Sequence, residues 1–299
     1  MGNRTKIKES KSDIIFLGFI YIVLIFILVV TVYPLLNVLS SSFSSSTAVV
    51  TGRVSIFPIE PTLIAYETIF ASSRIMIGYI NSFIYTIGGT CLQVMLTIMI
   101  AYPLSRKQLY GRGTITGLLT FTMFFSGGLI PTYMVVRSLN LIDTRWALII
   151  PGGMAVYQVI VARAFFQTTM SDELYEAAEL DGCSEFGILW RIVLPLSTAI
   201  IAVLTLIYAV GNWNAYFDAM IYLNSQELFP LQIILRSILI QNTQPGKILT
   251  DVSRMIAQRE MAILLKYSLI VVASVPVLIF YPFIQKYFVK GMMIGSLKG

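Results

Sequence analysis

The polar residues best suited to a specific task lie between positions 171 and 195, in a chain that is otherwise strongly apolar. This 171–195 segment reads Ser-Asp-Glu-Leu-Tyr-Glu-Ala-Ala-Glu-Leu-Asp-Gly-Cys-Ser-Glu-Phe-Gly-Ile-Leu-Trp-Arg-Ile-Val-Leu-Pro. It predicts a helix, a turn and a second helix. Ser171 is a candidate N-cap, Gly182 ends the first helix, Ser184 caps the second, and Pro195 begins the next long helix.

The first helix of the segment is predicted to have two faces. Its acidic face is formed, at helical spacing, by Asp172, Glu176 and Glu179. Its small-residue face is formed by Leu174, Ala177 and Ala178. Small residues permit close docking and carboxylates orient the docked partner, so the pattern indicates a mechanical contact and not bond-making chemistry. Periodicity alone leaves a second interpretation open, in which the segment is a loop that shields helix ends from water.

The residue types needed for several kinds of catalysis are absent from the sequence. There is no histidine, and no Gly-x-Ser-x-Gly motif marks a nucleophile. The two cysteines, Cys91 and Cys183, are too few for a disulfide framework or a metal quartet. The phosphate-binding loop Gly-x-x-x-x-Gly-Lys-Ser/Thr is also absent, so any ATP hydrolysis is expected on another chain. We expect neither an enzyme nor a resident cofactor.

The composition places the elements that carry this segment in a membrane. Of the 299 residues, 57% are hydrophobic and only 12% are charged. A bilayer core requires roughly 20 apolar helical residues per crossing, so the chain can cross several times. The 21 basic and 15 acidic residues are spread over short loops, which favours a role in topology over nucleic-acid binding.

Six spans are predicted, and both termini then lie on one side of the membrane. The spans are 14–36, 79–104, 114–136, 146–166, 196–210 with a polar extension to 216, and 267–287. Lys and Arg number twelve on the side of the termini and nine on the other, which places the termini in the cytoplasm. Residues 1–13 and 291–299 are cytoplasmic ends, and 14–290 form one domain with a polar loop at 167–195 and an external loop at 212–266.

Four further features of the chain are expected from local patterns. The first span is longer than a signal-peptide core and lacks a cleavage site, so it is interpreted as retained. The serine-rich stretch 40–46 and the prolines that follow at 57–61 indicate an ordered external loop. Several spans contain Pro or Gly, most clearly at 151–153, which indicates kinks in a bundle that bends. The apolar stretch 228–240 predicts a helix that lies either along the outer interface or in a buried position.

The 171–195 segment resembles the EAA signature of binding-protein-dependent ABC importer permeases. The resemblance is carried by Glu176, Ala177, Ala178, Asp181, Gly182, Leu194 and Pro195. Cys183 stands where alanine is common in that family. The resemblance implies an all-α, six-span type I ABC importer permease fold, with coupling helices that dock on a separate ATP-hydrolysing subunit.

The resemblance extends over most of the chain and indicates one subgroup of this family. The runs 127–133, 140–144, 213–217 and 285–299 are similar to carbohydrate permeases of the maltose type, in the subgroup for complex oligosaccharides. It implies partners: two ATP-binding subunits that hold ATP and Mg²⁺, a second and different permease, a solute-binding protein and membrane lipid. It also implies that the C-terminal tail, with Lys298 and Gly299, contacts the ATP-binding subunits, whereas the alternative is a frayed chain end.

Candidates for the substrate path cluster at the end of the fifth span. They are Trp213, Asn214, Tyr216 and Asp218. Aromatic faces with amide and carboxylate groups suit sugars, although an interfacial aromatic belt accounts equally well for the rings. Two alternative functions remain open on the sequence alone. One is a permease of the same architecture for a non-sugar solute, and the other is a channel or secondary transporter, which would carry charges inside its spans.

Overall fold

The computed structural model describes the backbone of residues 10–241 and 252–296, and every long element in these ranges is a helix. The chain divides into two compact units. The smaller unit contains residues 1–69 and 238–272, and the larger contains 70–237 and 273–299. The 171–195 segment and the residues around it belong to the larger unit.

The smaller unit contains the long apolar helix α1 (Lys11–Ser42) and a serine-rich loop. After the short helix α2 (Ser46–Val50), the loop leads to α3 (Ile64–Ala71). Ser44 orders this loop, because its hydroxyl donates to the Ser40 carbonyl at 2.6 Å and accepts from the Ile59 amide at 3.0 Å. The predicted order of the loop is therefore confirmed.

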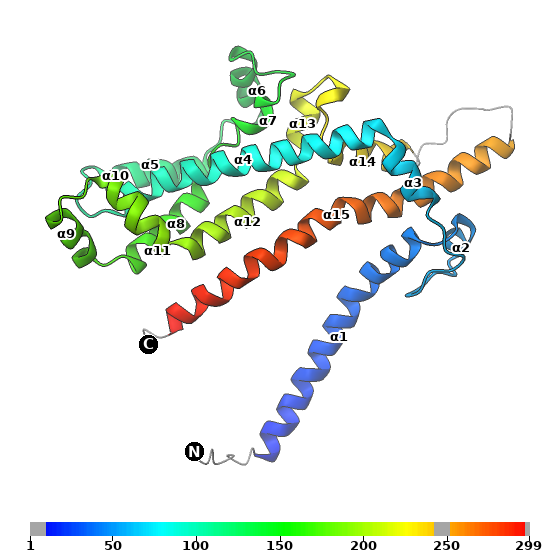
Figure 1. Cartoon of the computed structure of the whole chain (residues 1–299), viewed down its shortest axis with the longest axis horizontal. Helices are drawn as coiled ribbons and strands as arrows, with labels where there is room; N and C mark the ends of the chain where they lie inside the picture. Colours follow the sequence, from blue (N-terminus) through cyan, green and yellow to red (C-terminus); the bar gives the residue numbers. More distant parts are fainter. Residues whose placement is uncertain (1–9, 242–251, 297–299) are drawn as a thin grey trace. The chain divides into compact units, whose positions relative to one another are not determined.

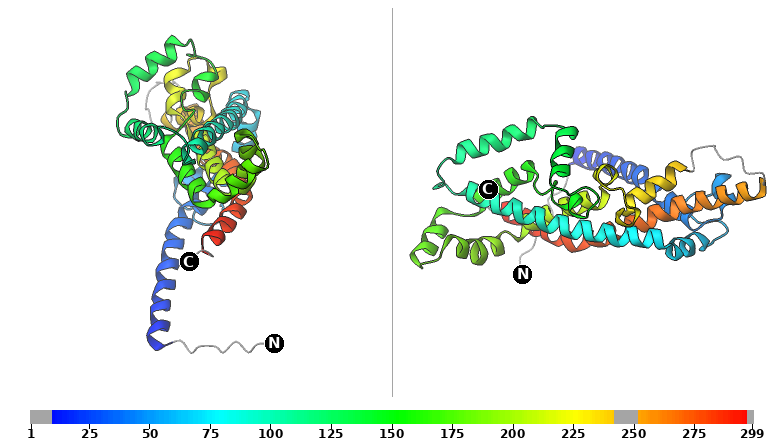
Figure 2. Two further views of the ribbon diagram at one scale, coloured as in Figure 1. Left: turned by 90° about the vertical axis from the view of Figure 1, so that its left-hand side faces the viewer. Right: turned by 90° about the horizontal axis from the view of Figure 1, so that it is seen from above.

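The larger unit is built on three helices that lie side by side (Figures 1 and 2). They are α4 (Ser73–Ser105), α8 (Val156–Thr169) and α12 (Thr198–Asn214). Their shared core includes the fully buried side chains of Phe166 and Leu204. A buried hydrogen bond of 2.7 Å also joins the hydroxyls of Thr97 and Tyr208 between α4 and α12.

Two predicted spans are divided by sharp breaks. The third consists of α5 (Arg112–Phe124) and α6 (Leu129–Ser138), which meet at 112°. Gly128 lies in the break with φ +82°, a value that favours glycine. The fourth is interrupted between α7 (Trp146–Ile149) and α8, at Pro151-Gly152-Gly153. The break in the third span is larger than the ordinary kink expected from the sequence.

The count of membrane-spanning helices follows from these breaks. In the described ranges, α1, α4 and residues 260–282 are each long and apolar enough to cross a bilayer. If each bent pair is one span, the number rises to five, the further two being α5 with α6 and residues 185–196 with α12. The predicted fourth span is the one that does not meet this criterion, because α8 has only 14 residues.

The predicted helix at 228–240 is present as α14 (Leu231–Gln241), after α13 (Phe217–Tyr222) and the short turn Gln226–Leu228. Leu231 and Ile234 are 0% and 2% exposed, so the buried alternative is correct for this end of the helix. The Leu231 amide donates to the Ser82 hydroxyl of α4 at 2.8 Å. Gly78 of α4 has no side chain, which leaves room for Ile234.

The final helix, α15 (Val252–Ser296), contains the predicted sixth span and extends beyond it at both ends. Pro276 and Pro282 lie inside it. Within the larger unit, the indole of Trp213 at the end of α12 donates to the Ala273 carbonyl of α15 at 2.9 Å. This buried bond attaches the end of α12 to the last helix of the chain.

Candidate functional site

The 171–195 segment folds as the predicted helix, turn and helix. Its first helix is α9 (Asp172–Leu180), and its second is α10 (Glu185–Ile188). Gly182 joins them with φ +76°, a left-handed conformation that favours glycine. The Ser184 hydroxyl caps α10 by accepting from the Gly187 amide at 3.2 Å. Ser171 occupies the N-cap position of α9, but its side chain makes no capping bond, which corrects that prediction.

The faces of α9 differ in part from the prediction. Tyr175 and Ala178 are 6% and 5% exposed, and Leu174 is half-buried. Ala177 is exposed, as is its neighbour Glu176. The buried face is therefore made of Leu174, Tyr175 and Ala178, whereas the exposed side combines carboxylates with Ala177.

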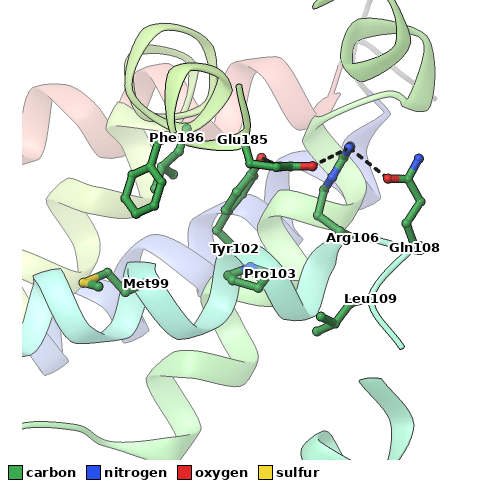
Figure 3. Close-up of a pocket in the computed structure, with 9 residues that line it drawn as sticks. Met99, Tyr102, Pro103, Arg106, Gln108, Leu109, Glu185 and Phe186 are labelled. Atoms are coloured by element: carbon green, nitrogen blue, oxygen red, sulfur yellow. Dashed lines mark hydrogen bonds and ion pairs between the residues drawn. The ribbon is translucent and has the colours of Figure 1, made fainter. Parts of the chain in front are cut away.

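The segment is attached to the end of α4 through Arg106, which is only 9% exposed. Its guanidinium lies 2.7 Å from a Glu179 carboxylate oxygen and 3.5 Å from one of Glu185. It also lies 3.7 Å from the centre of the Tyr175 ring. Figure 3 shows Arg106 between Glu185 and the amide of Gln108. One cation thus contacts both helices of the segment.

Two further contacts support this attachment. The Tyr102 hydroxyl of α4 donates to the second Glu185 carboxylate oxygen at 2.8 Å. Lys107 pairs with Asp172 at 2.5 Å, but both of these side chains are exposed. Burial raises the pKa of the Tyr175 phenol, and the charge of Arg106 opposes part of that rise. The phenol therefore stays neutral beside the guanidinium at ordinary pH.

The contribution of the Arg106 contacts is limited by the exposure of its partners. Breaking a fully buried ion pair costs about 3–5 kcal/mol. The Glu179 and Glu185 side chains are 42% and 60% exposed. Solvent screening therefore brings the contribution of each Arg106 ion pair closer to the roughly 1 kcal/mol that surface pairs contribute. The exposed Lys107–Asp172 pair lies at the lower end of this range.

An apolar cavity of about 380 Å³ lies beside these contacts. Its lining includes Met99 and Pro103 of α4 and Phe186 of α10, all labelled in Figure 3. Phe186 is itself largely exposed. The lining is mainly hydrocarbon and aromatic, so this cavity suits an apolar group and not a sugar.

The end of the segment turns into α12 through an irregular helix. Residues Leu189–Val193 form a π-helical turn, and Leu194–Leu196 form one further turn before an 81° bend. Pro195 has no amide hydrogen, so a regular helical bond cannot form at this position, which accounts for a local change of pitch. Leu194 is partly buried against the core, whereas Pro195 is exposed.

A second cavity, of about 340 Å³, is lined by polar groups of α4, α8 and α12. The Asn212 amide donates to the Gln93 side-chain oxygen at 2.8 Å and to the Thr90 hydroxyl at 3.2 Å. Gln93 donates in turn to the Gly152 carbonyl at 2.8 Å, in the break before α8. Gln158 also lines this polar cavity. These amides and hydroxyls can exchange hydrogen bonds with the hydroxyls of a bound molecule.

Asp218 is the one predicted path residue that lines the polar cavity. Neighbouring groups withdraw part of its carboxylate from water, and this desolvation raises its pKa. Among the described residues that line this cavity there is no Lys or Arg. The cavity therefore combines one carboxylate with neutral hydrogen-bonding groups and apolar side chains.

The other three path candidates lie outside the lining of the polar cavity. Trp213 is 3% exposed and packs edge-on against the rings of Tyr79 and Phe83. The Asn214 amide donates to the Val210 carbonyl of its own helix at 2.9 Å. The exposed ring of Tyr216 lies 4.8 Å from the Arg236 guanidinium. Their part in a substrate path stays a prediction, and Lys298 and Gly299 lie outside the described residues.

Several residues of these two sites were missed from sequence alone. They are Tyr102, Arg106, Gln93, Gln158 and Asn212. For the three amides, a signal was available, because a polar side chain within an apolar helix tends to face a cavity or a partner. No local signal identified Arg106, whose partner Glu179 is 73 positions away in the sequence.

Comparison with known proteins places these features in a family. The profile of the family described as binding-protein-dependent transport system inner membrane component matches residues 68–294. The polygalacturonan/rhamnogalacturonan transport system permease protein YtcP of Bacillus subtilis (strain 168) is 40% identical over 292 residues, which cover 98% of this chain and 100% of the relative. Protein LplC of the same organism is 41% identical over 90% of each chain.

A solved structure is similar over nearly the whole chain. It is the crystal structure of a bacterial ABC transporter involved in the import of the acidic polysaccharide alginate. The matched chain is 30% identical, with a TM-score of 0.85 over 95% of this chain and 100% of that one.

Proposed function

This chain belongs to the family of binding-protein-dependent transport system inner membrane components, and from that membership we propose that it is the permease subunit of an ATP-driven carbohydrate importer. Its fold is the type I ABC importer permease fold, as the match to the alginate transporter shows. The cargo is an oligosaccharide or polysaccharide fragment. A solute-binding protein delivers it, and it crosses the bacterial plasma membrane.

The observation that carries the proposed cargo is the similarity to YtcP over the full length of both chains. The substrates in the name of YtcP, like the alginate of the similar structure, are polysaccharides. The polar cavity supports the same proposal, because Gln93, Gln158 and Asn212 offer amide donors and acceptors to sugar hydroxyls. The carboxylate of Asp218 adds a strong acceptor.

The exposed side of the 171–195 segment supports the proposed coupling to ATP hydrolysis. Glu176, Ala177 and Asp181 are exposed there, and Gly182 holds the turn that presents them. We place this side against one of two ATP-binding subunits, which hold ATP and Mg²⁺. Both termini then lie in the cytoplasm, and the tail with Lys298 and Gly299 reaches the same subunits. A second, different permease completes the membrane-spanning pair.

Two other functions make different predictions. A permease for a non-sugar solute would have the same partners but a different cargo. A channel or secondary transporter would work without an ATP-binding subunit, and its functional charges would lie within the spans. The polar cavity instead contains neutral amides with one carboxylate, which favours the importer.

Uptake by a reconstituted complex tests the proposal. The operon that encodes this chain is expressed, and the complex is purified in mild detergent and placed in liposomes with its solute-binding protein. We expect ATP-dependent uptake of labelled oligogalacturonides or neutral oligosaccharides, and ATP hydrolysis that the loaded binding protein stimulates. A stable complex without an ATP-binding subunit, or uptake without ATP, contradicts the proposal. ATP-dependent uptake of a non-sugar solute alone would contradict the cargo.

A further inference from the structure

Arg106 is placed to connect the 171–195 segment rigidly to the long helix α4. It follows the last residue of α4 directly, and its guanidinium contacts Glu179 of α9 and Glu185 of α10. These two helices are separated by the Gly182 turn. A cation that holds both sides of a turn restricts rotation of one helix against the other.

Helix α4 adds a second contact to the same carboxylate. Tyr102 lies one turn before Arg106, and its hydroxyl donates to Glu185 at 2.8 Å. Glu185 is therefore bound from α4 by one hydrogen bond and one ion pair. The ring of Tyr175 lies against the guanidinium at 3.7 Å and limits its movement.

The other end of this connection is the polar cavity. Gln93 of α4 contacts both Asn212 of α12 and the Gly152 carbonyl. Gln93 and Ser105 are 12 positions apart in one continuous helix, roughly 18 Å at 1.5 Å per residue. If the segment is displaced and α4 moves with it as a rigid body, Gln93 in the cavity wall therefore moves as well.

From this geometry we infer that Arg106 is the positioning residue that transmits movement between the 171–195 segment and the polar cavity through α4. This inference rests on the proposed function, since it takes the segment as the contact with the ATP-binding subunit. Arg106 itself does not contact ATP or sugar. Its role is to keep the segment and α4 moving together.

The ratio of sugar imported to ATP hydrolysed tests this role, because loss of folding alone reduces both quantities together. We would measure it in the reconstituted complex for wild type, Arg106→Gln, Arg106→Lys and the matched control Arg112→Gln at the start of α5. Arg106→Gln is expected to lower the ratio by about tenfold. Arg106→Lys keeps the charge and recovers part of the loss, whereas Arg112→Gln leaves the ratio unchanged because Arg112 forms no ion pair within the described residues.

A milder variant covers the case in which Arg106→Gln does not assemble. Tyr102→Phe removes only the hydroxyl that binds Glu185, and we expect it to lower the ratio by about twofold to threefold. The inference is overturned if Arg106→Gln leaves the ratio of sugar imported to ATP hydrolysed unchanged. If the Arg106→Gln complex cannot be purified, an unchanged ratio in Tyr102→Phe overturns it. A wild-type complex without ATP-dependent uptake overturns the proposed function instead, so the two failures are distinguishable.

Discussion

The 171–195 segment and the polar cavity are held by different kinds of contact. The segment is attached by the charge of Arg106 to two carboxylates. The helices of the cavity wall are joined by neutral groups, chiefly by the hydrogen bond from the Asn212 amide to the Gln93 side chain. A typical neutral hydrogen bond contributes about 1 kcal/mol, so sugar hydroxyls can replace it at little cost. The contacts are of similar individual strength, but Arg106 makes three of them at once, to Glu179, Glu185 and the Tyr175 ring, so we expect the segment to stay fixed while single bonds of the cavity wall exchange partners.

The largest effect is expected at the turn of the 171–195 segment. Gly182→Val places a branched side chain at φ +76°, which costs about 2 kcal/mol in this conformation. We expect transport to fall by at least about tenfold, with the protein still inserted, as measured by uptake and immunoblot of membranes. Gly187→Ala is the matched control, because the nearest neighbour of the added carbon is 3.4 Å away. Equal activity of the two variants would show that the turn is only a loop.

A smaller effect is expected in the cavity wall. An alanine Cβ at position 89 would lie 2.9 Å from the Asn212 amide nitrogen, so Gly89→Ala displaces the amide from Gln93 and Thr90. Losing these two bonds costs about 1–3 kcal/mol, measured as a lower melting temperature with reduced uptake. Gly117→Ala on α5, where nothing lies within 4 Å, is the control and should not lower stability. A wild-type melting temperature in Gly89→Ala would show that the wall tolerates the change.

The cavity carboxylate is expected to influence cargo charge more modestly. Asp218→Asn removes repulsion of roughly 1 kcal/mol toward an acidic sugar, so uptake of acidic oligosaccharides should rise about fivefold relative to neutral ones. Because the pKa of Asp218 is raised, lowering the pH neutralises it early, and wild type should then approach the variant. Competition between labelled neutral and acidic cargo measures the ratio. An unchanged ratio would place the cargo away from Asp218.

The smallest effect concerns Asp143, which fixes the backbone after α13. Its carboxylate accepts from the Asn224 and Ser225 amides at 2.8 Å and from the Ser225 hydroxyl at 2.6 Å. These bonds lower the pKa of Asp143 below its usual value of 3.8. Their stabilisation is therefore present above pH 3.8 and is lost as the pH falls through the lowered pKa. Melting curves of wild type and Asp143→Asn should differ at neutral pH and converge in acid, and a constant difference would contradict this.

Local patterns in the sequence were sufficient for the helix, turn and helix of the 171–195 segment, but not for the Ser171 cap, the faces of α9 or the start of the long helix, which is Thr198 and not Pro195. Gly182 and Ser184 have the predicted roles because turn and cap preferences depend on a few neighbouring residues. The same applies to the long apolar helices α1 and α4, whose composition alone predicts them.

Contacts between distant positions could not be predicted in this way. Arg106 meets Glu179, and Gln93 meets Asn212, only because α4 packs against elements far along the chain. The exposure of Ala177 was also missed, because packing against the rest of the larger unit buries the Tyr175 side chain of α9 and leaves Ala177 on the exposed side. The 112° bend near residue 128 was missed because a glycine permits a bend without fixing its angle.

Cross-linking at the exposed side of α9 tests the central claim most directly. In a background with Cys91 and Cys183 replaced by serine, the thiol of Ala177→Cys is labelled with a reagent that carries a maleimide and a photoreactive benzophenone, and membranes that contain the whole complex are then illuminated so that the benzophenone bonds to whatever lies beside it. We predict a covalent product between this chain and an ATP-binding subunit, and none from Ser55→Cys in the exposed loop after α2. A transport-competent complex in which the cysteine introduced at position 177 reacts freely with maleimide but never joins the ATP-binding subunit would contradict the account.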